Sequence, residues 1–315
     1  MELKEPICFE PLFMERVWGG RRLETLFGKR LPQTTRIGES WEIVDREDAQ
    51  SVVHEGPLRG RTLHELWTQF REPVFGTGLP DAPRFPLLFK LLDAQDRLSV
   101  QVHPPAGVAV QLGGEPKTEM WYFVETLLGS DLYAGLKKGV TREAFERALL
   151  EGRVAEMIHR IPAKAGDALF IPSGRIHAIG AGNVIVEVQQ NSDTTYRVFD
   201  WNRLGLDGQA RALHIAQSLR SINFADAEPQ VLPPGSEVLA DCEHFRVERW
   251  ELDAPRPAEG PGFAIFAVIS GKVECAGRAF GAGDFFLVPP SLPQRELKPL
   301  GSGTAVLRTT HPSQV

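Results

Sequence analysis

The chain has 315 residues, 42% of them hydrophobic and 24% charged, and a formal net charge of −6 at pH 7. This length and composition are typical of a globular protein that buries one or two cores. The negative charge argues against a general binder of nucleic acid or anionic membranes, so we expect neither partner, although a local basic pocket for a phosphorylated metabolite is compatible with it.

The cysteines and the N-terminal residues bear on location. Cys8, Cys242 and Cys275 are odd in number and widely spaced, which is typical of reduced thiols and not of a disulfide framework or a zinc ribbon. Residues 1–6 are charged where a signal peptide needs an apolar core, and no run of about 18 apolar residues occurs. We therefore expect a cytoplasmic location.

Three segments have helical periodicity. Residues 61–70 place apolar side chains at helical spacing after Thr62, a suitable N-cap, and residues 141–161 carry a longer apolar stripe. Residues 213–224 predict a further short helix, and the Gly- and Pro-containing segment 73–86 predicts a loop. Most of the remaining chain reads as short strands separated by Gly and Pro, including 17–20 and 38–44, which favours a mainly β fold.

A nearly continuous apolar run at 85–92 predicts a buried strand, and Lys90 is its one charged residue. A lysine in such a strand either extends its ammonium group to solvent or points it into a functional site. The sequence leaves both interpretations open.

Polar residues alternate with apolar ones in the next segment, 98–104. Ser99, Gln101 and His103 therefore share one face of a predicted strand. Lys117 and Glu119 also stand two residues apart. A further histidine, His177, ends the segment 166–177 after an apolar run.

Together these segments predict a metal site of Gln101, His103, Glu119 and His177. Two imidazoles, one carboxylate and one neutral amide oxygen leave the ion with residual positive charge, which suits a Lewis acid. Zinc fits this ligand set best, and nickel, manganese and iron remain alternatives.

A second polar cluster follows at 184–197. If a strand runs through 184–193, Glu187 and Asp193 lie on the same face, and Arg197 places a fixed cation close to these acids. The alternative is a sheet with a solvated polar face. Beside a metal, such a cluster is suited to proton transfer on a polar substrate.

An internal repeat indicates the domain organisation. Gly-Asp-Ala-Leu-Phe-Ile-Pro at 166–172 is echoed by Gly-Asp-Phe-Phe-Leu-Val-Pro at 283–289, and Gln294 takes the position of His177. A Pro-rich stretch at 227–236 lies between the copies. We predict two β-barrel domains, residues 1–230 with the metal site and attached helices, and residues 236–315 without metal ligands.

Several of these segments together resemble type I mannose-6-phosphate isomerases of the short bacterial form. The resemblance covers about residues 9–224 and rests on the segments 85–93, 98–104, 117–122, 166–177 and 191–197. The Gly-x5-Pro-x-Gly-x2-His pattern ending at His177 is also similar to the second cupin motif. The resemblance implies two cupin jelly-roll barrels.

The resemblance also implies an activity. It implies one zinc ion per chain, held by the four residues named above, and reversible isomerisation of mannose 6-phosphate and fructose 6-phosphate through a cis-enediol. Arg197 matches the family's catalytic arginine, and Asp193 and Lys117 match two positions considered for proton transfer. Ser99 and Lys117 match positions of substrate or phosphate contact.

Other parts of the prediction extend or depart from this family pattern. We assign Lys90 and Glu187 to the substrate-binding set, and we expect a monomer or homodimer. Long-form members often have a histidine before the lysine, proposed to open the sugar ring, but Pro116 stands there. That role cannot be transferred to this chain.

Two alternatives belong to other functional classes. Another cupin metalloenzyme acting on sugars is one, although a dioxygenase would more often use an iron site without the Gln101 ligand. A non-catalytic sugar-binding bicupin is the other, although such a module has little need for four metal ligands together with Arg197.

Overall fold

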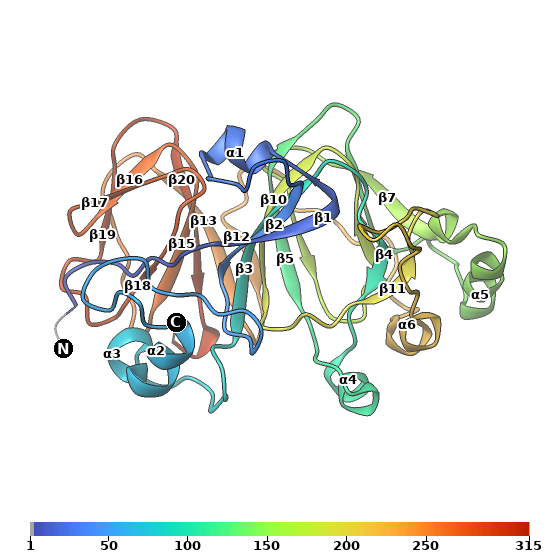
Figure 1. The fold of residues 1–315 in the computed structure, drawn as a ribbon, viewed down its shortest axis with the longest axis horizontal. Helices are drawn as coiled ribbons and strands as arrows, with labels where there is room; N and C mark the ends of the chain where they lie inside the picture. Colours follow the sequence, from blue (N-terminus) through green and yellow to red (C-terminus); the bar gives the residue numbers. More distant parts are fainter. Residues whose placement is uncertain (1–2, 315) are drawn as a thin grey trace.

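The chain folds around four antiparallel sheets, so the prediction of a mainly β fold is confirmed (Figure 1). The computed structural model describes residues 3–314. The first sheet has the order β1 (Leu12–Gly20), β2 (Ile37–Ile43), β3 (Leu87–Ala94), β10 (Asn183–Gln190), β5 (Glu119–Thr126) and β8 (Ala168–Ile171). The second sheet has the order β11 (Tyr196–Phe199), β4 (Val100–Val102), β9 (His177–Ile179), β6 (Asp131–Leu136) and β7 (Ile158–Pro162).

The other two sheets are formed by the C-terminal part of the chain, which lies on the left in Figure 1. One has the order β12 (Val238–Asp241), β13 (Arg246–Leu252), β20 (Thr304–Thr310), β15 (Ala264–Ser270) and β18 (Phe285–Val288). The other has the order β14 (Arg256–Pro257), β19 (Glu296–Pro299), β16 (Lys272–Cys275) and β17 (Arg278–Gly281). The domain boundary at 230–236 remains a prediction.

The helices lie outside the sheets (Figure 1). They are α1 (Arg22–Phe27), α2 (Leu63–Gln69), α3 (Arg71–Phe75), α4 (Ala106–Leu112), α5 (Arg142–Leu150) and α6 (Ile215–Ser221), with 3₁₀ turns at Val154–Met157 and Pro312–Gln314. None of the helices within residues 3–314 has both the length and the apolar character needed to cross a bilayer.

Local sequence signals account for the helix that begins after Thr62. The Thr62 side chain accepts a hydrogen bond from the backbone N–H of Glu65, and the Glu65 carboxylate accepts one from the backbone N–H of Thr62. This reciprocal capping box satisfies donors that a helix start leaves unpaired. The predicted helices after Thr62 and at 213–224 are confirmed, each in a shorter form.

Two of the predicted elements are wrong in part. The predicted helix at 141–161 ends at Leu150, because Gly152 takes a left-handed backbone conformation with φ 68° and the chain then enters strand β7, which pairs with β6. Helix α3 occupies the first residues of the predicted loop at 73–86. In both places neighbouring elements determine the outcome and the local apolar pattern does not.

The internal repeat corresponds to the same turn built twice. Gly166 and Gly283 adopt left-handed conformations with φ 89° and 87°. The aspartate after each glycine accepts a backbone hydrogen bond from the residue three positions earlier, at 2.9 Å for Asp167 and 2.8 Å for Asp284. Strands β8 and β18 follow these turns. Beyond them the copies differ, because His177 is buried whereas Gln294 is exposed.

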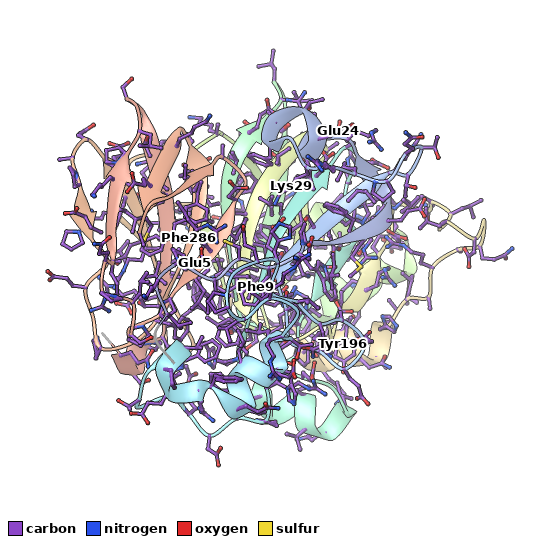
Figure 2. The ribbon with its side chains drawn as sticks, turned by 60° about the vertical axis from the view of Figure 1, so that its left-hand side comes forward. Glu5, Phe9, Glu24, Lys29, Tyr196 and Phe286 are labelled. Atoms are coloured by element: carbon purple, nitrogen blue, oxygen red, sulfur yellow. The ribbon has the colours of Figure 1, made fainter. Side chains whose placement is uncertain are left out.

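One hydrophobic cluster joins the two pairs of sheets. The Phe263 ring lies 5.6 Å from the rings of Phe75 and Phe85, measured between centroids, and the backbone of Ile7 pairs with Leu287 of β18. Figure 2 shows Phe9 among the densely packed interior side chains, whereas Glu24 lies on helix α1 at the surface. The C-terminal sheets therefore share a core with the N-terminal ones.

Candidate metal centre and cavity

The four predicted metal ligands come together at the junction of three strands. Gln101 of β4 pairs directly with His177, the first residue of β9. His103 follows β4 by one residue, and Glu119 begins β5. The alternation seen in the sequence thus brings Gln101 and His103 to one face, where the other two residues meet them.

The ligand atoms of this cluster are close together, and His103, Glu119 and His177 are fully buried. His103 Nε2 lies 3.6 Å from Glu119 Oε2, and His177 Nε2 lies 3.3 Å from Glu119 Oε1. The ligand atoms of these three residues all lie within 4.8 Å of one another. The amide nitrogen of Gln101 lies 3.2 Å from His177 Nε2, and a rotation of the amide by 180° places its oxygen at that point instead.

Both imidazoles are oriented by backbone carbonyls behind them. Nδ1 of His103 lies 2.9 Å from the carbonyl oxygen of Thr194, and Nδ1 of His177 lies 2.9 Å from that of Arg175. Each Nδ1 therefore carries the proton and donates it, which leaves Nε2 with its lone pair toward the cluster. Burial lowers the pKa of both imidazoles, to about 4 for His103, so both are neutral at pH 7.

The donor set is suited to a cation. Two Nε2 lone pairs face the Glu119 carboxylate, so acceptors oppose acceptors. Both Glu119 oxygens are buried and lack a hydrogen bond of good geometry within residues 3–314, although Lys117 Nζ lies 2.6 Å from Oε2. Lys117 neutralises part of this charge at Oε2, and a metal ion between the lone pairs would do so at Oε1, which faces His177 Nε2.

Lys117 lies between the metal cluster and a second carboxylate. Its Nζ is 2.6 Å from Glu119 Oε2 and 3.7 Å from Glu187 Oε1. Burial opposes the ammonium charge, but the two carboxylates raise the pKa of Lys117 above its usual value. In this arrangement Lys117 is a proton donor and a fixed positive charge.

Lys90 also points into this site, so the interpretation in which it extends to solvent is wrong. Its side chain is 5% exposed, and its Nζ lies 3.3 Å from Glu187 Oε1 and 3.8 Å from Glu39 Oε2. Glu187 accepts a hydrogen bond from Trp121 Nε1, and Glu39 accepts two from the guanidinium of Arg16. Acidic and basic groups thus alternate along the inner face of the first sheet.

A cavity of about 530 Å³ opens beside the cluster, between the first and second sheets. Seven of the ten predicted site residues line it: Lys90, Ser99, Gln101, Lys117, Glu187, Asp193 and Arg197. The other three, His103, Glu119 and His177, are buried behind this lining, with no exposed surface. The arrangement can hold a polar ligand beside a metal ion, with proton donors and acceptors in the cavity wall.

Comparisons with known proteins identify the family. A family model of the type I phosphomannose isomerase catalytic domain matches residues 8–120. The mannose-6-phosphate isomerase ManA of Bacillus subtilis is 36% identical over 93% of this chain and 96% of its own length. The chain belongs to the type I phosphomannose isomerase family. A mannose-6-phosphate isomerase of Streptococcus mutans is likewise 36% identical, over 92% of this chain and 94% of its own length.

The fold agrees with this membership. The crystal structure of the Bacillus subtilis mannose 6-phosphate isomerase superposes with a TM-score of 0.87 at 31% identity, covering 96% of this chain and 99% of that one. The predicted cupin fold and the predicted enzyme class, an aldose–ketose isomerase, are thereby confirmed. Family membership also favours an isomerase over the two alternative functions.

Other residues of this phosphomannose isomerase cavity were not predicted from the sequence. Arg16, Glu39, Trp121 and Arg211 all line it. Glu39 gives a weaker signal than Lys90, since its strand also contains Ser40 and Glu42. Arg16 and Arg211 have no such signal, because neither is the one charged residue of an apolar strand pattern.

The strand carrying Glu187 ends earlier than expected. Strand β10 stops at Gln190, because the Asn191 side chain donates hydrogen bonds to the carbonyl oxygens of Asp45 and Phe85 and turns the chain. The strand therefore does not run through Asp193, and the condition for a common strand face with Glu187 is not met. Asp193 still lines the cavity, from the loop that leads to β11.

Proposed function

We propose that this protein interconverts mannose 6-phosphate and fructose 6-phosphate through a cis-enediol, with one zinc ion held by Gln101, His103, Glu119 and His177. The observation that carries the proposal is the convergence of two imidazole lone pairs on the buried carboxylate of Glu119, beside a cavity lined by Lys117 and Asp193. The names of the relatives supply the substrate pair.

Zinc suits this set because two neutral imidazoles, one carboxylate and one amide oxygen match its preferred ligands. When bound, the ion supplies positive charge that stabilises negative charge developing on substrate oxygens. The carbonyls of Thr194 and Arg175 fix the two imidazole rings for this purpose.

The reaction needs one carbon-bound proton to move. Isomerisation of the aldose removes the proton on C2 and returns a proton to C1, while O2 loses a proton and O1 gains one. We assign Asp193, an exposed carboxylate on the cavity wall, as the base that removes the proton from C2 and returns it to C1. Lys117, kept protonated by Glu119 and Glu187, donates to a substrate oxygen and is not the base.

Three further groups bind and orient the substrate in this proposal. The guanidinium of Arg197 stabilises the negative charge of the enediolate. Ser99 and Glu187 hydrogen-bond to sugar hydroxyls, and Lys90 forms an ion pair with the buried Glu187. The phosphorylated hexose is the only partner that this proposal requires.

The test is a turnover experiment in D₂O followed by proton NMR. The zinc-loaded protein should convert mannose 6-phosphate to fructose 6-phosphate and introduce solvent deuterium at C1 of the product, because a carboxylate base exchanges its proton with the solvent. Complete absence of deuterium in the product, at normal turnover, would contradict Asp193 as the base and favour a shift of hydrogen between the carbons. An absence of turnover would contradict the isomerase itself.

A further inference from the structure

Two arginines hold one buried carboxylate at the edge of the cavity, and a third arginine lies close to them. Arg211 donates to both oxygens of Asp200, from Nε at 2.7 Å and from its terminal nitrogen at 2.5 Å, and Arg203 donates to Oδ1 at 2.9 and 3.1 Å. Although burial opposes its charge, hydrogen bonds from Arg211 help to hold the pKa of Asp200 below its usual range. Only Arg211 of this pair lines the cavity.

Arg197 is the third arginine and lies next to Arg211. A terminal nitrogen of Arg197 donates to the carbonyl oxygen of Ala212, the residue after Arg211, at 2.9 Å. Its Nε is buried and has no hydrogen-bond partner within residues 3–314. Burial, and to a smaller extent the nearby charge of Arg211, lower the pKa of Arg197.

The opposite wall of the cavity is balanced in charge. On the first sheet, Lys90 lies between Glu39 and Glu187, and Lys117 lies between Glu119 and Glu187. On the second sheet, by contrast, Asp200 is shared between Arg203 and Arg211, and Arg197 adds a further cation. The positive charge that faces the cavity from the side of β11 is therefore that of Arg197 and Arg211, beside the carboxylates of Asp193 and Asp207.

This charge lies beside the residues that hold the sugar in the proposed function. Arg197 pairs in register with Gln101 across β11 and β4, and Ser99 is two residues from Gln101 on the same face. The segment 201–213 leaves β11 and returns along it, since the backbone N–H of His214 donates to the carbonyl oxygen of Arg197. Arg211 is thus presented at the cavity edge by a loop anchored to the site.

We propose that Arg211 contacts the phosphate group of the substrate and determines the preference for phosphorylated over neutral sugars, with Asp200 as its positioning residue. The inference rests on the proposed function and deepens it. A guanidinium fork matches two phosphate oxygens, which a point charge does not. Asp200 holds the Nε–Nη2 edge of Arg211, so the Nη1–Nη2 edge is the fork that would face phosphate, and the unpartnered Nε of Arg197 offers a further donor.

The experiment measures binding of glucitol 6-phosphate, which has no carbonyl group and cannot isomerise, by calorimetry on the zinc-loaded protein. Arg211→Gln should raise its dissociation constant about 10- to 100-fold. The dissociation constant of Arg211→Lys, which keeps the charge but not the fork, should lie between those of the wild type and Arg211→Gln. Arg203→Gln is the matched control, since it removes an arginine from Asp200 that does not line the cavity, and it should stay within about threefold of the wild type.

The same variants are assayed with mannose 6-phosphate and with mannose. Arg211→Gln should lower the ratio of kcat/KM for the phosphorylated over the neutral sugar by at least tenfold, with KM for mannose 6-phosphate carrying most of the change. Equal effects of Arg211→Gln and Arg203→Gln would overturn a direct phosphate contact, as would unchanged binding in Arg211→Gln. Wild-type protein that binds glucitol 6-phosphate but does not isomerise mannose 6-phosphate would support the anion subsite and contradict the proposed function.

Discussion

The Nε2 atom of His103 and the Oε2 atom of Glu119 face each other at 3.6 Å, and neither carries a proton to share. The Nδ1 proton of His103 is committed to the carbonyl of Thr194, and the pKa of Glu119 lies below its usual range, with Lys117 opposing the effect of burial. Lys117 Nζ lies 2.6 Å from this Oε2 and 3.4 Å from this Nε2, and a metal ion facing the same lone pairs would add positive charge to this buried site.

Replacing Glu119 tests this interpretation. Glu119→Gln keeps the size of the side chain but removes the charge, so the dissociation constant for zinc should rise at least 100-fold and isomerase activity should fall with metal content. Elemental analysis after dialysis measures how much zinc each variant retains. Glu125→Gln, on the same strand but paired with Arg22 away from the cluster, is the control. Full metal content in Glu119→Gln would show that the carboxylate is not a ligand.

Arg197 should affect turnover and leave metal binding intact. Arg197→Gln should lower kcat by about 10²- to 10³-fold, the range expected when one donor to a developing oxyanion is removed. Zinc content should remain at the wild-type level. Arg220→Gln on helix α6, an exposed position, controls for the loss of one positive charge. A near-normal kcat in Arg197→Gln would contradict its catalytic assignment.

The sequence predicted those parts of the site whose signals are local. Ser99, Gln101 and His103 alternate within one strand, so their common face follows from strand geometry alone. The ion pair between Lys90 and Glu39, by contrast, joins residues 51 positions apart, and the alternating charges of the first sheet exist only after β2 and β3 pair.

The parts of the site that the sequence did not predict also depend on contacts between distant parts of the chain. Nothing near Arg211 in the sequence indicates that a loop returns it to the cavity beside Arg197. The strand through Asp193 ends because Asn191 finds backbone partners at Asp45 and Phe85, about 146 and 106 positions away. Tertiary partners of this kind override a local period-two pattern.

Glu39 should make the free energy of unfolding depend on pH under acidic conditions. Burial opposes its charge, but Lys90 and Arg16 lower its pKa from 4.5 to about 2. The pKa of Glu39 is lower in the folded state than in the unfolded state. Its ionised form therefore contributes fully to the free energy of unfolding above about pH 4.5, and this contribution is lost as the pH falls toward 2. Glu39→Gln should lower the free energy of unfolding at pH 7 by on the order of 3 kcal/mol.

Urea denaturation at a series of pH values measures this effect. The difference in unfolding free energy between wild type and Glu39→Gln should be constant from pH 5.5 to 8 and should narrow below pH 4.5. Glu24→Gln, an exposed substitution on α1 where Glu24 pairs with Arg21, should show a much smaller trend of the same sign. A difference that stays constant down to pH 3.5 would show that the folded-state pKa of Glu39 is not depressed.

The shared aromatic cluster should make the two pairs of sheets unfold together. Phe263 is fully buried and contacts Phe75 and Phe85 from the other half of the chain. Phe263→Ala should lower the free energy of unfolding by about 3–5 kcal/mol. It should also shift the single transition seen by both tryptophan fluorescence and circular dichroism. Two separated transitions in the wild type would show that the halves are energetically independent.

The central claim is that a metal held by His103, Glu119 and His177 supports sugar-phosphate isomerisation. The most direct measurement is conversion of mannose 6-phosphate to fructose 6-phosphate by the purified protein, before chelation, after chelation and after zinc is restored. We predict that activity is lost with the metal and returns in proportion to zinc bound, up to one ion per chain. Turnover that persists after complete removal of the metal would contradict this account.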